Sequence, residues 1–302
     1  MKKILSALLV LVLAFGLFGC NQDVVDPEVL EVQLIPSSDA DVLGAQKLPL
    51  QNLLEAELGM EVNVTIATDY NALIEGMKSE QIHVGFLASA SYVLAHDEGC
   101  AEVILKSTRY DVADDGTLLE DEPLIAGYSS QLVVAAGSGI TDVEGLEGKT
   151  IAIASFTSTS GFIWPANLLA DHGLDPMEDV TWLDAGGHDK AILAVINGQA
   201  DAAFTYKDAR QRVVEAHPNV NELVLFVLNT ELIPNDTISV IPNLKRSLKE
   251  DIKQAFLNIA ASAEGSVIID AIYSHKGYAE AKDSDYDIVR TYLERQEEWD
   301  FD

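Results

Sequence analysis

Apolar and polar positions follow two different spacings along most of the chain. Short runs that are fully apolar or have a period of two are typical of β-strands, and longer runs with apolar residues three or four apart are typical of helices. The expected strands are 29–35, 62–68, 83–88, 102–110, 129–136, 149–155, 180–183, 200–205 and 222–228. The expected helices are 40–58, 70–80, 89–99, 158–171, 187–197, 206–216, 244–260, 262–274 and 286–299.

The regular alternation of strand and helix predicts an α/β fold with mainly parallel sheets flanked by helices. Two segments interrupt it: 126–128, after an acidic loop, and 229–240, which contains "IPND". If the chain crosses between two lobes at both places, lobe one is 29–127 plus 236–302 and lobe two is 128–235. A ligand is then expected between the lobes, outside the carboxyl ends of the strands.

The first 20 residues have the pattern of an export signal. Lys2 and Lys3 precede an apolar run, and Gly19-Cys20 ends it like a bacterial lipobox. The predicted segments are a lipoprotein signal peptide at 1–19 and a polar tether at 20–28, with Cys20 carrying the lipid (palmitate). The mature protein is then expected to be exported, soluble and tethered to the outer face of the cell membrane, or periplasmic. The alternative is an ordinary secretory signal with a chance cysteine.

Charge narrows the classes of partner. The formal net charge is −30, from 19 basic and 49 acidic residues. No basic stripe is available to neutralise phosphates, which excludes a nucleic-acid partner. The negative charge is compatible with a solvated surface or with a cationic ligand. We prefer the first interpretation, because net charge affects solubility and association rather than the fold.

One segment partly matches the sequence pattern of a nucleotide-binding loop. "VEGLEGKT" (143–150) ends in Gly-Lys-Thr, but the required glycine is replaced by Val143 and a strand, rather than a helix, follows. We interpret it as a turn into a strand.

A hydroxyl-rich run, "TSTSG" (157–161), lies between a buried strand and an apolar helical stretch. Backbone N–H groups at a helix N-terminus bind anions without any lysine. Ser158, Thr159 and Ser160 add hydroxyl donors, and we expect Gly161 to let a ligand approach the backbone. A cap needs only one of these oxygens. Taken alone, the run leaves capping and anion binding equally open.

A second informative stretch is 184–210. Gly186-Gly187 precede a helix whose first turn holds His188 and Asp189, and the strand that follows ends near Tyr206 and Asp208. Side chains at the end of a parallel strand are placed for ligand binding. A lone histidine is more often a surface or capping residue than a ligand-binding one.

Together these stretches resemble the phosphonate/phosphite-binding subunits of ABC importers. The resemblance covers about 29–275 and rests on "DYNALIEGMKSEQIHVGFL", "SYVLA", "GKTIAIASFTSTSGF", "AGGHDKAILAVINGQADAAFTYKDAR" and "IPNDTI". It implies a two-lobed type II periplasmic-binding fold that closes on a small oxyanion and delivers it to an ABC permease, with no cofactor and no metal. One departure is Ala88-Ser89-Ala90, where the family often has Gly-Pro.

The resemblance also implies ligand-binding residues. Ser158, Thr159, Ser160 and His188, a histidine able to carry a proton, would hold the phosphonate oxygens. Tyr70 and Tyr128 would join from the other lobe and the hinge. In aminoalkylphosphonate binders acidic residues hold the amine, and Asp208 and Asp236 occupy the matching stretches.

Two other functions are weighed against a binding protein. Ser158, His188 and Asp189 could be imagined as a catalytic triad, but no nucleophile-elbow pattern occurs in a suitable context, and adjacent helical residues point about 100° apart. A ligand-sensing partner for a membrane receptor would use the same pocket.

Overall fold

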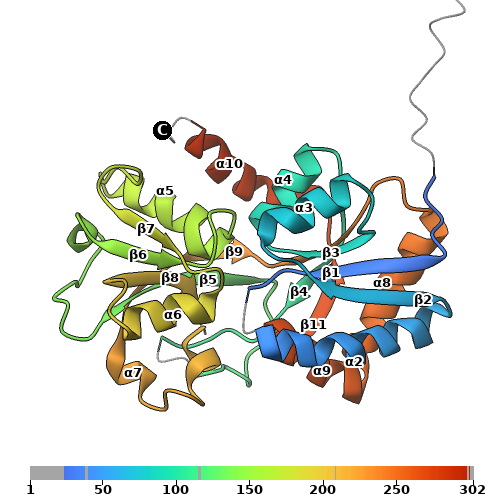
Figure 1. Cartoon of the computed structure of the whole chain (residues 1–302), viewed down its shortest axis with the longest axis horizontal. Helices are drawn as coiled ribbons and strands as arrows, with labels where there is room; N and C mark the ends of the chain where they lie inside the picture. Colours follow the sequence, from blue (N-terminus) through green and yellow to red (C-terminus); the bar gives the residue numbers. More distant parts are fainter. Residues whose placement is uncertain (1–23, 38–39, 115–116, 208, 298, 300–302) are drawn as a thin grey trace, which may run out of the picture.

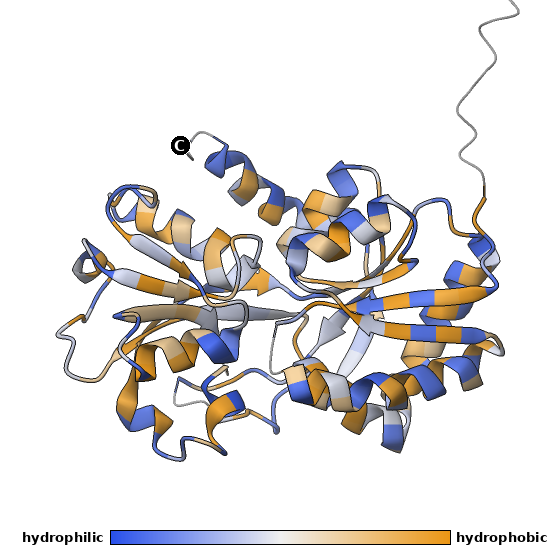
Figure 2. Cartoon of the chain, viewed as in Figure 1, coloured by the Kyte–Doolittle hydropathy of each residue, from blue (hydrophilic) through white to orange (hydrophobic). Residues whose placement is uncertain are grey.

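The computed structural model describes residues 24–37, 40–114, 117–207, 209–297 and 299. Two lobes lie side by side along the long axis of the molecule, each built on one sheet with helices packed on it (Figure 1). Apolar residues gather on the strands and inner helix faces, and polar residues lie on the outer faces (Figure 2). The predicted α/β fold class is confirmed.

The larger lobe holds a six-stranded sheet of order β11-β4-β10-β3-β1-β2. Its strands are β1 (Val29–Leu34), β2 (Glu61–Ile66), β3 (Val84–Leu87), β4 (Glu102–Thr108), β10 (Thr237–Val240) and β11 (Gly277–Glu280). Strands β1 to β4 share one direction, and β10 and β11 run against them. The sheet is therefore parallel over its N-terminal part and antiparallel where the chain returns to it.

The smaller lobe holds a five-stranded sheet of order β7-β6-β8-β5-β9. Its strands are β5 (Gly127–Ala135), β6 (Thr150–Ile153), β7 (Thr181–Asp184), β8 (Ala202–Tyr206) and β9 (Val224–Pro234). Strand β5 runs against the other four. The chain passes between the sheets twice, from β4 to β5 and from β9 to β10, so both sheets meet at the centre of the molecule.

The α-helices cover the outer faces of both sheets. They are α2 (Ala40–Leu58), α3 (Tyr70–Lys78), α4 (Ser89–Asp97), α5 (Trp164–Asp171), α6 (His188–Ile196), α7 (Val220–Leu223), α8 (Arg246–Ala261), α9 (Ala263–Tyr273) and α10 (Asp287–Gln296). Among the described residues no single helix is long and apolar enough to cross a membrane; α8 and α9 pass that test of length and composition only as a pair, bent by 97°.

Several predicted elements differ from the structure. The helix expected at 206–216 is only a 3-10 turn at Ala209–Val213, and the helix expected from 158 begins with a π-helical turn, Thr159–Ile163. Strands β10 and β11 were not predicted. Both have only four residues, and β11 is a partly exposed edge strand with little apolar alternation, so neither gives a clear periodic signal.

The C-terminal helix α10 packs against both lobes. Its Arg290 pairs with Asp97 of α4 at 3.3 Å, and the Tyr292 ring lies 4.3 Å from the Trp164 ring of α5. The buried Asn167 amide of α5 donates to the Tyr292 carbonyl (3.1 Å) and to the Ile163 carbonyl (2.9 Å). The hydrophobic core is consequently continuous from the larger lobe, through α10, into the start of α5.

Asn167→Ala should therefore destabilise the protein. Two buried carbonyls would each lose one hydrogen bond, although the Ile163 carbonyl keeps the one from the Gln296 side-chain amide. The loss of two bonds costs roughly 1–3 kcal/mol of the free energy of unfolding. Denaturant unfolding followed by circular dichroism measures this. Asn63→Ala is the matched control, because Asn63 is exposed and donates only to Glu31, and its change should stay within about 0.5 kcal/mol. Equal losses in the two variants would contradict a role for Asn167 in joining α10 to α5.

Candidate functional site

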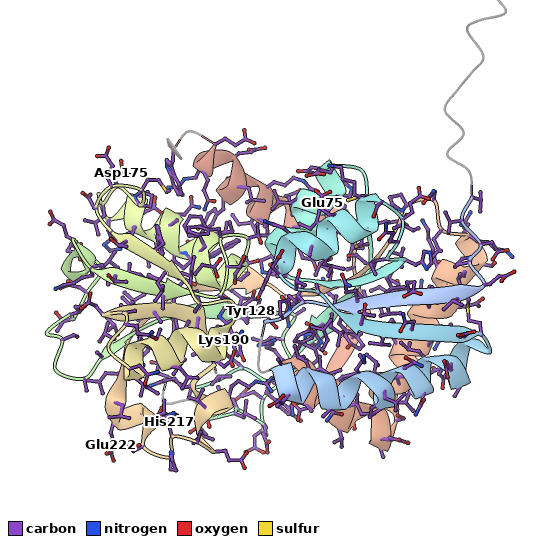
Figure 3. The ribbon with its side chains drawn as sticks, in the orientation of Figure 1. Glu75, Tyr128, Asp175, Lys190, His217 and Glu222 are labelled. Atoms are coloured by element: carbon purple, nitrogen blue, oxygen red, sulfur yellow. The ribbon has the colours of Figure 1, made fainter. Side chains whose placement is uncertain are left out.

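A small cavity lies between the lobes. Its volume is about 30 Å³, room for roughly two water-sized spheres. Residues of both lobes line it: Ile35, Ser37, Tyr70, Ala88, Arg109, Tyr128, Ser158, Ser160, His188, Tyr206, Arg212, Asp236, Ile272 and Tyr273. Tyr128, at the start of β5, is labelled between the two lobes in Figure 3.

The hydroxyl-rich run forms one wall of this cavity. Ser158 is the N-cap of the π-helical turn, and its hydroxyl accepts the backbone N–H of Gly161 at 3.2 Å. The first N–H groups of a helix have no acceptor within it. In this turn those groups belong to Thr159 and Ser160, which precede the Gly161 N–H that Ser158 caps. Because a hydroxyl accepts twice and donates once, Ser158 can cap the turn and still donate its proton to a ligand.

Gly161 has a different role from the one expected. A Cβ there would lie 2.9 Å from the Ser158 hydroxyl and 3.2 Å from the Ala154 nitrogen. The glycine therefore makes room for the Ser158 side chain and for the strand behind it, and the expectation that it admits the ligand is wrong. Nearby, the Ser130 hydroxyl donates to the Ser160 carbonyl at 2.6 Å and fixes the turn on β5.

Two buried tyrosines meet the two serines. Tyr70, at the start of α3 in the larger lobe, and Tyr128, at the start of β5, line the cavity together with Ser158 and Ser160. Burial first, and then the charge of Asp236, raises the pKa of both phenols above its usual range. Both therefore remain protonated and able to donate at neutral pH.

His188 begins α6 and is 3% exposed. Its Nε2 lies 3.3 Å from the Ser158 hydroxyl, and its ring packs edge-on to Tyr206 with centroids 4.8 Å apart. Burial lowers the pKa of His188 to about 3; the charge of Asp236 opposes this and that of Arg109 adds to it. The imidazole is therefore neutral in this form of the protein and offers one N–H donor rather than a positive charge.

The positive charge of the cavity comes from two arginines that sequence reasoning missed. Arg109 follows the end of β4 and is 7% exposed, and Arg212 comes from the 3-10 turn after β8. Arg109 lies at the end of an expected strand, as Tyr206 does. The rule that ligand-binding side chains lie at the ends of strands could therefore have identified Arg109 as well. No periodic or motif signal marks Arg212.

The two predicted acidic residues have different outcomes. Asp236 precedes β10 and lines the cavity, with one carboxylate oxygen 3.7 Å from Nε2 of the buried His275. Asp208 lies outside the described residues. A role for either with an amine stays a prediction.

Thr159 is not among the residues that line the cavity. Its hydroxyl accepts the Ala90 backbone N–H at 2.8 Å and a hydrogen bond from Ser89 at 3.1 Å. Both donors belong to the first turn of α4, whose own N-cap, Ala88, has no capping side chain. Thr159 thus caps a helix of the other lobe, at the Ala88-Ser89-Ala90 stretch where this sequence departs from the family pattern.

Other hydrogen bonds also join the lobes around the cavity. The His188 backbone N–H donates to the Ser37 carbonyl at 3.2 Å, and the Ser91 hydroxyl donates to the Thr157 carbonyl at 3.3 Å. On another side, Arg212 donates to the Ala271 carbonyl. The structure therefore has the two lobes in contact, with the cavity enclosed between them.

Comparison with known proteins decides the class. The family model for the periplasmic substrate-binding proteins of ABC transporters for phosphonate matches residues 32–286. The chain belongs to this family. It is 26% identical over 281 residues to the phosphate-import protein PhnD of Mycolicibacterium smegmatis, covering 87% of this chain and 84% of that one.

Two further proteins are similar over most of the chain. The phosphonates-binding periplasmic protein of Escherichia coli is 25% identical over 249 residues, covering 81% of this chain and 70% of that one. The crystal structure of PhnD1 from Prochlorococcus marinus, in complex with methylphosphonate, superposes with a TM-score of 0.75 at 20% identity, covering 90% and 99% of the two chains. This likeness confirms the predicted type II periplasmic-binding fold.

Members of this family are substrate-binding proteins of transporters rather than enzymes, so the imagined triad of Ser158, His188 and Asp189 is set aside. The site agrees with this assignment. Ser158 is close to His188, yet the carboxylate beside the histidine in sequence lies on the same helical turn, where the two side chains diverge.

The depressed pKa of His188 predicts a pH dependence of stability. The unfolded chain protonates this residue below about pH 6.5, whereas the folded protein does so only near pH 3. The free energy of unfolding should therefore fall as the pH is lowered from about 6.5 toward 3, by about 1.4 kcal/mol per pH unit from this group. His188→Asn should flatten the profile of the ligand-free protein. Urea unfolding between pH 7 and 4.5 measures both, and parallel profiles would refute a buried, neutral His188.

Proposed function

We propose that this protein is a lipid-anchored, extracytoplasmic solute-binding protein that captures a phosphonate, phosphite or similarly small oxyanion and delivers it to an ABC permease. The observation that carries the proposal is the convergence of hydrogen-bond donors from both lobes on one enclosed cavity. Ser158 and Ser160 lie in one lobe with His188, and Tyr70 reaches them from the other.

The chemistry of these donors fits a tetrahedral oxyanion. Such an anion presents several oxygen acceptors in different directions, and the five groups offer hydroxyl and imidazole protons from several sides: Tyr70, Tyr128, Ser158, Ser160 and His188. Hydrogen bonds to a charged group contribute about 1.5–3 kcal/mol each, so five give roughly 7–15 kcal/mol before the costs of ordering and closure. Micromolar affinity needs only about 8 kcal/mol.

The names of similar proteins support the same ligand class. The Mycolicibacterium smegmatis protein imports phosphate, and the Prochlorococcus marinus structure holds methylphosphonate. For delivery, we propose that lobe closure is what the permease recognises, since closure brings together surfaces of two lobes that are separate when the cleft is open. The bonds from Thr159 to the first turn of α4 would form only in that closed state.

The ligand-binding role predicts the behaviour of a double variant. Ser158→Ala with Ser160→Ala removes two hydroxyl donors, so its affinity for the ligand should fall by roughly 100-fold or more. Isothermal titration of the mature protein against phosphite, methylphosphonate, 2-aminoethylphosphonate and phosphate measures this.

Ser138→Ala is the matched control, because Ser138 is a half-buried serine of the same lobe that lies outside the cavity. The affinity of this variant for the ligand should be unchanged. Failure of the unaltered protein to bind any of the four anions would refute the proposed function. Unchanged affinity in the double variant would refute the role of the two serines.

The lipid anchor rests on the sequence, because Cys20 lies outside the described residues. In a bacterium that processes lipoproteins, the protein should incorporate labelled palmitate and fractionate with the membrane. Cys20→Ser should abolish the label and release the protein.

Cys100→Ser controls for the loss of a thiol. Cys100 is 6% exposed and its Sγ donates to the Ala95 carbonyl, so it is buried in the fold. This variant should keep label and membrane association. Retention of label by Cys20→Ser would show that the signal is processed differently.

A further inference from the structure

The Thr159 hydroxyl is directed at the larger lobe rather than at the cavity. Its oxygen accepts the Ala90 N–H at 2.8 Å and the Ser89 hydroxyl at 3.1 Å. A hydroxyl oxygen has two lone pairs, so these two bonds use its whole capacity as an acceptor. All three residues are fully buried. Water is therefore excluded from the contact, and each partner depends on the other for its hydrogen bond.

Helix α4 needs an acceptor from outside at this position. Its N-cap is Ala88, which has no side-chain oxygen, and the Tyr92 N–H donates to the Ala88 carbonyl in the ordinary helical pattern. The N–H groups before Tyr92 lie in the first turn, where a helix offers them no acceptor. Ala90 belongs to that turn, so its N–H is satisfied by Thr159 when the lobes are in contact and by water when they are apart.

The turn that carries Thr159 also carries groups that face the cavity. Ser158 and Ser160 precede and follow Thr159, and both line the cavity. The Ser160 carbonyl accepts the Ser130 hydroxyl, which fixes the turn on β5. The direction of the Thr159 hydroxyl and the directions of the two serines are thus set by one piece of backbone. A ligand that holds the serines also holds Thr159 in place for α4.

A second bond at the same place joins the same two elements. The Ser91 hydroxyl of α4 donates to the Thr157 carbonyl at 3.3 Å. This bond and the two bonds of Thr159 link one protein group to another and include no group that lines the cavity. Their contribution to contact between the lobes is therefore the same whichever anion occupies the site.

We propose that Thr159 is a positioning residue: its side chain holds the lobes in contact through α4 and does not touch the ligand. This inference rests on the proposed function for its effect on binding. Because apparent affinity scales with the population of the binding-competent arrangement, Thr159 strengthens binding of every ligand by the same factor and slows its release. It replaces the direct contact with phosphonate oxygens that the family resemblance implied for this side chain.

The first test needs no ligand. Thr159→Val keeps the shape of the side chain and removes the hydroxyl, so contact between the lobes would leave the Ala90 N–H buried against a methyl group, which is unfavourable. Hydrogen–deuterium exchange of the ligand-free mature protein, followed by NMR at the Ala90 amide, should show protection that Thr159→Val loses. Thr159→Ser keeps the hydroxyl and should keep the protection.

The second test measures binding kinetics. In stopped-flow experiments with methylphosphonate and with phosphate, Thr159→Val should speed dissociation of both by the same factor, about 10-fold or more. Association should change little, because the ligand enters before the lobes meet. Thr65→Val is the matched control. The Thr65 hydroxyl is half-buried and bonds to Gln33 and to the Val32 carbonyl within the larger lobe, so this variant should keep both rates and the Ala90 protection.

Ser89→Ala tests the same contact from the other lobe if Thr159→Val does not fold. It removes one of the two donors to Thr159 and should speed dissociation about 3-fold. In the double variant with Thr159→Val the effects should not add, because Ser89 no longer has a hydroxyl to leave unsatisfied.

Each outcome decides one of the two proposals. Equal Ala90 exchange in the unaltered protein and in Thr159→Val would overturn the inference and leave the proposed function intact. Loss factors that differ between the two anions, or that Thr159→Ser shares, would also overturn it. If neither anion binds while the exchange difference is found, the proposed function fails and the contact between Thr159 and α4 stands.

Discussion

The hydroxyl of Ser158 lies where three parts of the molecule meet. It accepts the Gly161 N–H in its own turn, lies 3.3 Å from Nε2 of His188 in α6, and lines one cavity with Tyr70 of the other lobe. Because a hydroxyl has one proton and two lone pairs, this oxygen can hold the turn, contact the histidine and still donate to a ligand. A helix start that lacks internal acceptors is thereby joined to a second helix and placed opposite the other lobe, at the wall of the cavity.

Much of the fold follows from the spacing of apolar residues, and some of the site does not. Short buried strands such as β3 and β6 consist mostly of apolar residues, and such runs can be recognised in the sequence. The alternation of strand and helix could therefore be predicted. Strand β11 could not, because a short edge strand is held by its neighbour rather than by its own pattern. The π-helical turn also has no periodic signature, since it depends on how Ser158 and Gly161 pack together.

The same distinction separates the residues of the site. His188 and the serines belong to local stretches whose composition suggests anion binding, and the structure brings Ser158, Ser160, His188, Tyr70 and Tyr128 to one cavity. Thr159 looked equivalent to its neighbours, but its direction is set by α4 of the other lobe, which no local pattern encodes. The arginines were missed for a related reason: in a chain of net charge −30, two cations from distant segments become significant only when folding places them together.

The position of α10 restricts how the lobes can separate. Two chain crossings, β4 to β5 and β9 to β10, already connect the lobes. Helix α10 adds a third link, because its Arg290 pairs with an aspartate of α4 and its Tyr292 packs on a tryptophan of α5. Because α10 contacts both lobes, a separation that leaves α10 in place would widen the molecule on the side away from it, where Arg212 donates to the Ala271 carbonyl of α9. The last helix of the chain would thus determine on which side the cavity could open, although none of the residues that line the cavity belongs to that helix.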